Sequence, residues 1–421
     1  EAISNRALTL SEQEKDRQKQ LTLLDRDGLL RHAKDYAKRG RLQLALEYYS
    51  RLIALDRANT TVLLERALVY ERLRDFQHAI QDLSTAITLD PRMVTAFQAR
   101  ARVLTEQDQL DQALSDLAQA YKLNPSPLLH GNLLCARGRL YHKQGNLDQA
   151  LREFDQAVSL YPTQSTLYLY RALLLRDQNQ PTRAGRDFET GLGISPNNVD
   201  LLYQQGLFLL DRDNLQESLV IANRILKLQR LSSNALHLRG TAYYKMQFPA
   251  LALADLSEAI VENPDHLGAL YQRALIFEDQ NKLQEAISDL TRIIQRTPNY
   301  RDALYRRALM SEKQGNLQQA SQDLKTVVSF NPKNFDAVYR QALISVKQDK
   351  LAQALQDFDR AIELKYSQAS LYNHRGLVYL KRRMFDQARQ DFDHAIRLDS
   401  NYTEAISNRA LTLSEQEKDR Q

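Results

Sequence analysis

The sequence predicts an all-α solenoid of antiparallel helical hairpins. The main observation is a period of 34 residues, with units starting at 26, 60 and 94 and, after a three-residue slip, at 131, 165, 199, 233, 267, 301, 335 and 369. A twelfth unit starts at 403 and stops at 421. Periods in this range are typical of stacked supersecondary units in which neighbours bury one continuous core. We therefore look for function on an extended surface.

Residue size within each unit predicts how two helices pack. Position 8 is Ala or Gly in every unit, and position 20 is Ala in ten of eleven complete units, with Ser218 as the exception. Position 24 is large in every complete unit except the one with Ala222. Small residues at positions 8 and 20 let two helices approach closely, and a large residue at position 24 fills the space beside them.

Helix-ending residues give the boundaries inside each unit. Position 15 is often Gly, Asn or Asp, namely Gly40, Asp108, Gly145, Asn179, Asp213, Asn281, Gly315 and Asp349. Position 32 is Pro in seven units, namely Pro91, Pro125, Pro162, Pro196, Pro264, Pro298 and Pro332. Both residue types favour the end of a helix. Each unit is thus predicted to hold a first helix ending near position 15 and a second helix ending before position 32.

This combination of small, large and helix-ending positions resembles the tetratricopeptide repeat family. The resemblance covers about residues 26–421 and implies a right-handed superhelix whose concave groove binds segments of partner proteins. The chain departs from the family pattern in lacking Trp at position 4, where Leu, Phe, Tyr, Ile or Val stands instead. That departure changes packing detail without threatening the fold.

Two interruptions and the chain ends define the expected domains. Residues 128–130 are inserted after Pro125 and Pro127, and unit 199–232 departs most from the pattern. These places are interpreted as soft joints or as drift in redundant units. The expected groups are a helical segment at 1–25, three units at 26–127, three units at 131–232, five units at 233–402, and a truncated unit or capping helix at 403–421.

The first and last 18 residues are identical, because residues 1–18 and 404–421 share one sequence. Neighbouring repeats diverge heavily, so this identity is not repeat drift. The chain is either a window on a larger array with a unit of 403 residues, or the terminal helix has been repeated artificially at the front. The segment leaves an apolar stripe of Ile406, Ala410 and Leu413, which predicts homo-oligomers formed through the chain ends.

A polar regularity accompanies the apolar one. Position 7 is Arg in nine units and position 23 is Asp or Glu in nine; eight complete units have both. We expect structural ion pairs within the hairpin, such as Arg66 with Asp82, Arg273 with Asp289 and Arg307 with Asp323, although an acid could also reach the Arg of the next unit. These pairs occupy many basic residues, and the net charge is only +5, so nucleic acid is not an expected partner.

The sequence carries no recognisable catalytic or cofactor motif. It has no glycine-rich phosphate loop, nucleophile elbow or His pair at metal-binding spacing, so no enzyme activity, cofactor or metal is expected. His130, Cys135 and His142 come nearest to a cluster, but their spacings do not place all three on one helix face. The single cysteine fits a reducing compartment. No membrane span is expected. We expect a cytoplasmic, ciliary or other intracellular protein and, because the first residue is Glu1, a fragment.

The family resemblance places the groove on positions 2, 5, 9, 12 and 13 of the first helices. The candidate partner-binding residues are Tyr203, His237, Tyr271, Tyr305, Tyr339 and Asn373 at position 5, Leu275, Leu309, Leu343 and Leu377 at position 9, and Lys245, Lys313, Lys347 and Lys381 at position 13. An alternative is that Tyr packs on the adjacent hairpin and that Lys is placed to suit a helix C-terminus. The family's carboxylate clamp of Lys and Asn is not matched.

Three functions follow from these observations. The favoured one is a non-catalytic scaffold that binds an extended or helical segment of a protein partner, with apolar and acidic residues, along 267–381. Tyr supplies contact area at little entropic cost, and Lys attracts acidic partners. The second is the recognition arm of a larger enzyme, and the third is a solenoid that assembles end to end.

Overall fold

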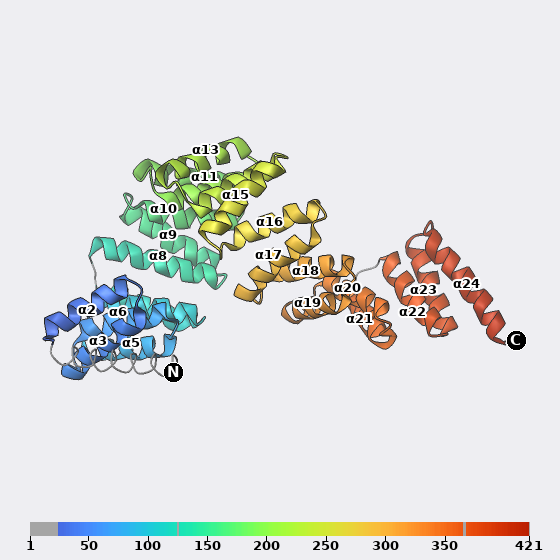
Figure 1. Cartoon of the computed structure of the whole chain (residues 1–421), viewed down its shortest axis with the longest axis horizontal. Coiled ribbons are helices and arrows are strands. Elements are labelled where there is room, and N and C mark those ends of the chain that lie inside the picture. The colour runs from blue at the N-terminus through green and yellow to red at the C-terminus, as the bar shows by residue number, and fades with distance from the viewer. Residues whose placement is uncertain (1–23, 124–125, 365–367, 421) are drawn as a thin grey trace, which may run out of the picture. The chain divides into compact units, whose positions relative to one another are not determined.

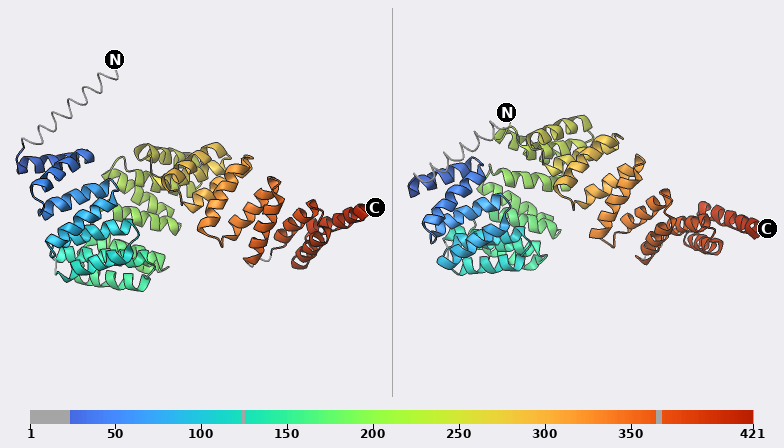
Figure 2. Two further views of the ribbon diagram at one scale, coloured as in Figure 1. Left: turned by 90° about the horizontal axis from the view of Figure 1, so that it is seen from below. Right: turned by 60° about the horizontal axis from the view of Figure 1, so that its bottom comes forward.

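The protein is all-α in the part of the chain that the structure describes. This computed structural model describes residues 24–123, 126–364 and 368–420, and all its regular elements are helices. The chain divides into two compact units, at residues 1–204 and 205–421, each built from helical hairpins (Figure 1). Within each unit the hairpins follow one another in chain order (Figure 2). The predicted all-α solenoid of hairpins is confirmed.

The helices follow the repeat closely. In the eleven complete repeats every first helix ends at position 13 and every second helix begins at position 17. The first helices are α2 (Arg26–Lys38), α4 (Thr60–Arg72), α6 (Val94–Glu106), α8 (Pro127–Lys143), α10 (Ser165–Asp177), α12 (Val199–Asp211), α14 (Ser233–Lys245), α16 (Leu267–Asp279), α18 (Arg301–Lys313), α20 (Phe335–Lys347) and α22 (Ala369–Lys381), followed by α24 (Thr403–Arg420). The second helices are α3 (Leu42–Leu55), α5 (Phe76–Leu89), α7 (Leu110–Lys122), α9 (Leu147–Leu160), α11 (Pro181–Ile194), α13 (Leu215–Leu228), α15 (Pro249–Glu262), α17 (Leu283–Arg296), α19 (Leu317–Phe330), α21 (Leu351–Glu363) and α23 (Phe385–Leu398).

One backbone motif ends all eleven of these first helices. Position 15 has a positive φ in each complete repeat, including the non-glycine residues Arg74, Gln247 and Arg383. In the repeat with Arg74, the amide of Arg74 donates to the carbonyl of Glu71, and the amide of Asp75 donates to that of Tyr70. This is the Schellman arrangement, which satisfies the last carbonyls of the helix and turns the chain toward the second helix.

Size complementarity fills the core of each hairpin. Ala67, Ala79 and Leu83, at positions 8, 20 and 24 of one repeat, pack in one buried cluster. Where position 24 is Phe, the contact is closer still, because a Cβ added to Gly376 would lie 2.7 Å from the ring of Phe392. The close approach of the two helices therefore depends on the small residue at position 8.

The inserted residues lengthen a helix. Helix α8 has 17 residues where the first helices of the other complete repeats have 13, so 128–130 add nearly one turn at its beginning. The duplicated segment at 1–18, Pro125 and Gln421 lie outside the described residues. The five groups of repeats expected from the sequence stay a prediction.

The first helices also pack on one another across repeats. Direct contacts join α4 to α6 and α8 to α10 in the first unit, and α14 to α16, α20 to α22 and α22 to α24 in the second. Each unit thus has a surface of adjoining first helices, with the second helices behind it. We call the surface of the first helices the groove.

Candidate functional site

The Arg at position 7 pairs with the acid at position 23 of its own repeat. Seven pairs use Nε and Nη2 on the two oxygens of one Asp, at 2.6–2.8 Å. The eighth joins Arg137 to Glu153 at 2.8 Å. The pairs are Arg66–Asp82, Arg100–Asp116, Arg137–Glu153, Arg171–Asp187, Arg239–Asp255, Arg273–Asp289, Arg307–Asp323 and Arg375–Asp391. We call this series the ladder.

Most ladder arginines also reach back to the preceding repeat. The third nitrogen, Nη1, donates to position 25 of the previous second helix at 2.7–3.1 Å. The acceptors are Ser50, Ser84, Asp155, Asn223, Ser257, Thr291, Asp359 and, for Arg409 of the last repeat, Asp393. One guanidinium therefore fastens three helices, and its planar fork suits this bidentate contact. The position-25 acceptors were not recognised in the sequence.

Two complete repeats have neither the Arg nor the acid of the ladder. In the first repeat the ring of His32 lies 5.7 Å from that of Tyr48, so aromatic packing occupies the ladder positions. In repeat 199–232 Ser218 donates a hydrogen bond of 3.1 Å to the carbonyl of Gly206. The side chain that departs from Ala at position 20 is therefore satisfied inside the hairpin.

The predicted position-5 residues are only partly open to solvent. His237 and Asn373 are buried, whereas Tyr203, Tyr271, Tyr305 and Tyr339 are half-buried. The hydroxyl of Tyr271 accepts from Arg306 Nε at 2.9 Å, and the amide oxygen of Asn373 accepts from Asn408 at 2.9 Å. Both bonds go to the next first helix. Part of this column therefore holds repeats together.

Burial shifts the pKa values of three of these residues, His237, Tyr203 and Tyr339. Burial lowers the pKa of His237 to about 3, with a smaller contribution from neighbouring His266, so the imidazole is neutral at physiological pH. Burial raises the pKa of Tyr203 to about 12, which keeps its hydroxyl protonated. Neither His237 nor Tyr203 offers a charge to a partner.

The predicted lysines at position 13 lie at the exposed ends of the first helices. Lys245 pairs with Asp213 at 2.8 Å, Lys347 with Glu312 at 2.6 Å and Lys381 with Asp349 at 2.6 Å. Lys313 forms no ion pair with a described residue. The leucines at position 9 run beside them: Leu275, Leu309 and Leu343 are half-buried and Leu377 is 36% exposed.

A groove pocket brings three predicted residues together. It has a volume of about 300 Å³ between α18 and α20, and Leu309, Lys313 and Lys347 line it with Glu312 and Arg340. The last two were not singled out in the sequence, although they stand at positions 12 and 6 of their helices. Glu312 contacts both Lys347 and Arg340, the latter at 3.7 Å.

The first unit has a larger groove pocket that sequence reasoning missed. It encloses about 550 Å³ between α6 and α8 and is lined by Arg102, Glu106, Arg139 and Lys143, among others. Arg102 pairs with Glu71, and Arg139 lies 4.6 Å from the ring of Tyr170. Arg at position 9 of two successive first helices, where later repeats have Leu or Thr, was the available signal.

The His130, Cys135 and His142 group makes separate contacts. His130 Nδ1 lies 2.7 Å from the hydroxyl of Tyr161, and His142 lies 3.0 Å from Asp177. Cys135 is buried, and burial raises the pKa of its thiol to about 12, so it is not a reactive thiolate. Within the described ranges no three His, Cys, Asp or Glu side chains are grouped to hold a metal ion.

The helices are too short or too polar for a bilayer. Among those that the structure describes, none combines the length and the apolar character needed to cross a membrane.

Sequence comparison agrees with the architecture. Stacked hairpins with a repeated ladder define a helical-repeat protein. Residues 30–94, 237–301, 277–335 and 339–403 match one model described as tetratricopeptide repeat, and residues 131–164 match a second model with the same description. The chain belongs to the tetratricopeptide repeat family, and the family prediction is confirmed. No curated protein sequence matches the chain.

One solved structure shows the same kind of fold, and two others match less well. The human IFIT1 dimer with PPP-AAAA matches with a TM-score of 0.52 and 16% identity, over 85% of this chain and 91% of that one. The Cut9–Hcn1 hetero-tetramer of the APC/C matches with a TM-score of 0.38 and 15% identity, over 95% of this chain and 92% of that one. A tetratricopeptide repeat protein from Parabacteroides merdae matches with a TM-score of 0.37 and 21% identity, over 59% of this chain and 99% of that one.

Proposed function

We propose that this chain is a non-catalytic scaffold that binds an extended or helical segment of a partner protein along the groove of repeats 267–381. Its family supports a protein-interaction role in general terms. The observation that carries the finer proposal is the charge of the groove pocket between α18 and α20, where Lys313, Arg340 and Lys347 stand against Glu312.

Excess positive charge selects the partner's chemistry. In the α18–α20 pocket Glu312 is already occupied by Lys347 and Arg340, so the ammonium of Lys313 is available to an incoming carboxylate. Leu309 lines the same pocket and offers an apolar contact four residues earlier on the helix. The partner segment therefore combines an acidic residue with an apolar one, and its binding weakens as salt rises.

The test reverses the charge of the pocket. Lys313→Glu combined with Leu309→Ala should reduce capture of the principal partner from cell extract by about tenfold or more, because loss of a desolvated charge contact commonly exceeds about 1.4 kcal/mol. Capture is measured by quantitative mass spectrometry at low and at moderate salt. Tyr305→Ala, Tyr339→Ala and Lys347→Glu, at three positions that the sequence predicts to line the groove, form a second combined variant.

Lys333→Glu is the matched control, because Lys333 is exposed in the turn between α19 and α20, away from the groove pocket. Circular dichroism must show unchanged helicity for each variant. Equal capture by the wild type and both groove variants would mean that recognition lies on another surface.

End-to-end association is a second candidate, favoured by the exposed apolar side chains of α24. Ile406, Leu411 and Leu413 are 39%, 49% and 41% exposed. Sedimentation velocity of the intact chain should show larger species as concentration rises, and Ile406→Glu with Leu413→Glu, or deletion of 404–421, should remove them. A monomer at high concentration would rule this function out.

A further inference from the structure

The ladder is broken in repeat 335–368. Gln341 stands at position 7 where eight complete repeats have Arg, yet the acid of position 23, Asp357, is present. Ser345 donates to Asp357 at 3.2 Å and Gln353 donates at 3.1 Å. Burial raises the pKa of Asp357. The carboxylate has thus kept its place in the fold without the guanidinium that its counterparts bind.

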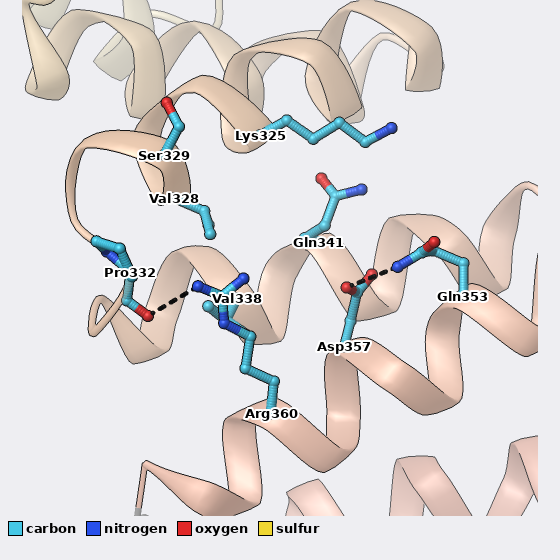
Figure 3. Close-up of a pocket in the computed structure, with 9 residues that line it drawn as sticks. All are labelled: Lys325, Val328, Ser329, Pro332, Val338, Gln341, Gln353, Asp357 and Arg360. Atoms are coloured by element: carbon cyan, nitrogen blue, oxygen red, sulfur yellow. Dashed lines mark hydrogen bonds between the residues drawn. The ribbon is translucent and has the colours of Figure 1, made fainter.

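A pocket lies where the guanidinium would be. It has a volume of about 370 Å³ and is lined by residues of α19, α20 and α21, including Val328, Val338, Gln341 and Asp357. Figure 3 shows these side chains reaching into the space between the two second helices. The shorter glutamine leaves open a volume that the longer arginine side chain occupies in other repeats.

Gln341 adds an unused acceptor to this pocket. The residue is only 6% exposed, and its Nε2 donates to Ser321 at 3.0 Å. Its Oε1 is buried and accepts no hydrogen bond from the described residues. A buried acceptor without a donor carries a free-energy penalty that a bound donor would remove. Asp357 and Gln341 together therefore present acceptors to a group rich in N–H donors.

The adjacent repeat provides a template for that group. There Arg307 places Nε and Nη2 on Asp323 at 2.8 and 2.7 Å, and Nη1 on Thr291 at 3.0 Å. The Asp357 pocket keeps the carboxylate of this template, but position 25 is Lys325, so the neutral acceptor is instead the Oε1 of Gln341. A carboxylate with a neutral acceptor nearby matches the planar fork of a guanidinium better than a compact ammonium. The walls formed by Val328 and Val338 suit the methylene stem of an arginine.

We propose that the Asp357 pocket binds the guanidinium of an arginine side chain supplied by a partner protein. The pocket opens between second helices, so it is distinct from the groove, and the proposal does not depend on the groove function. The arginine completes the ladder in trans by taking the place that an internal arginine holds in eight other repeats.

Lys325 tunes this site. It stands at position 25 of the preceding repeat, where ladder arginines elsewhere find Ser, Thr, Asn or Asp. Its positive charge and that of Arg360, which also lines the pocket and donates to the carbonyl of Pro332 at 3.3 Å, favour the ionised form of Asp357. Lys325 forms no ion pair with the described residues. Lys325 is exposed and can turn toward solvent when a guanidinium enters. Its repulsion weakens binding relative to a serine at this position.

The experiment uses fluorescein-labelled nonapeptides of Gly and Ser with one central residue, measured by anisotropy on the full chain. The peptide with Arg should bind at least about tenfold more tightly than those with citrulline or Lys, because only Arg has both the charge and the fork. Asp357→Asn should weaken binding by about tenfold or more, whereas Lys325→Ser should strengthen it. Agmatine, which carries the same guanidinium on a methylene stem, should compete with the Arg peptide for the pocket.

Gln341→Arg is the decisive variant, because an internal arginine should fill the pocket, raise the Tm and abolish binding of the Arg peptide. The groove substitution Lys313→Glu should leave peptide binding unchanged, which separates this site from the proposed function. The proposal is overturned if neither the wild type nor Lys325→Ser prefers Arg over citrulline. A raised Tm for Gln341→Arg without that preference would show a gap in the ladder and no binding site.

Discussion

Replacing Asp289 with Ala should lower the free energy of unfolding by about 3 to 5 kcal/mol, because it strands the guanidinium of Arg273 inside the hairpin. The side chains of Arg273 and Asp289 are only 18% and 4% exposed, so solvent screens the pair weakly. Arg273 also donates to Ser257 of the preceding repeat at 3.1 Å. The loss is therefore expected at the junction of two repeats as well as within one.

A double-mutant cycle on Arg273→Met and Asp289→Ala measures the interaction itself. The double variant should lose less than the sum of the single losses, since it leaves no unpaired buried charge. Denaturant unfolding gives the free energies, and hydrogen exchange of α16 and α17 reports the local effect that a repeat protein allows. Coupling below about 0.5 kcal/mol would contradict a structural role for the ladder.

The exposed pair of Arg296 and Asp265 is the matched control. Its side chains are 64% and 53% exposed, although its N–O distance of 2.8 Å equals that of the buried pair. Exposed pairs contribute about 0.2 to 1 kcal/mol. The same cycle on this pair should therefore give much weaker coupling, which isolates burial as the cause.

The hairpin fold could be predicted because its determinants recur at fixed positions. A single Ala or Gly says little, but Ala67, Gly138 and Gly376 at the same position of different repeats indicate one packing requirement. The turn was harder to read. Arg74, Gln247 and Arg383 adopt positive φ without the Gly, Asn or Asp that favours it. Packing of the two helices imposes that conformation, and local propensity does not.

The ladder could be predicted only in part, for a chemical reason. Position 7 is Arg in nine units and position 23 is acidic in nine, so these two positions can be recognised in the sequence. The third contact uses Ser50, Asp155, Asn223 and Thr291 at one position. These residues share only an oxygen acceptor, which makes the column look unspecific. Its role emerges when successive repeats are placed side by side.

The groove residues at position 5 could be predicted only in part, because the sequence does not show how adjacent repeats pack. Helical periodicity places position 5 on the inner face, but it cannot say how far the next repeat covers it. Asn373 is buried beneath Asn408 and Tyr402, whereas Tyr305 keeps a partly open ring. The same position therefore offers contact area in one repeat and a structural hydrogen bond in another.

Phe392→Ala should cost about 3 to 5 kcal/mol, because it removes a fully buried ring and leaves a cavity. The sharper test exchanges one size combination for another. Phe392→Leu alone should leave space beside Gly376. Gly376→Ala alone should press a methyl group against the ring, because a Cβ on residue 376 would lie 2.7 Å from Cε1 of Phe392. Together they recreate the combination of Ala67 with Leu83.

The double variant Gly376→Ala with Phe392→Leu should therefore be more stable than the sum of its single changes predicts, by about 1 kcal/mol. Alanine also favours the helix over glycine by up to about 1 kcal/mol, but that gain is present in the single variant and cancels in the cycle. Gly376→Ala combined with Phe188→Leu in another repeat is the control and should be additive. If both combinations are additive, the residues at positions 8 and 24 are not coupled energetically. The backbone turn, and not their complementary sizes, would then set the distance between the two helices.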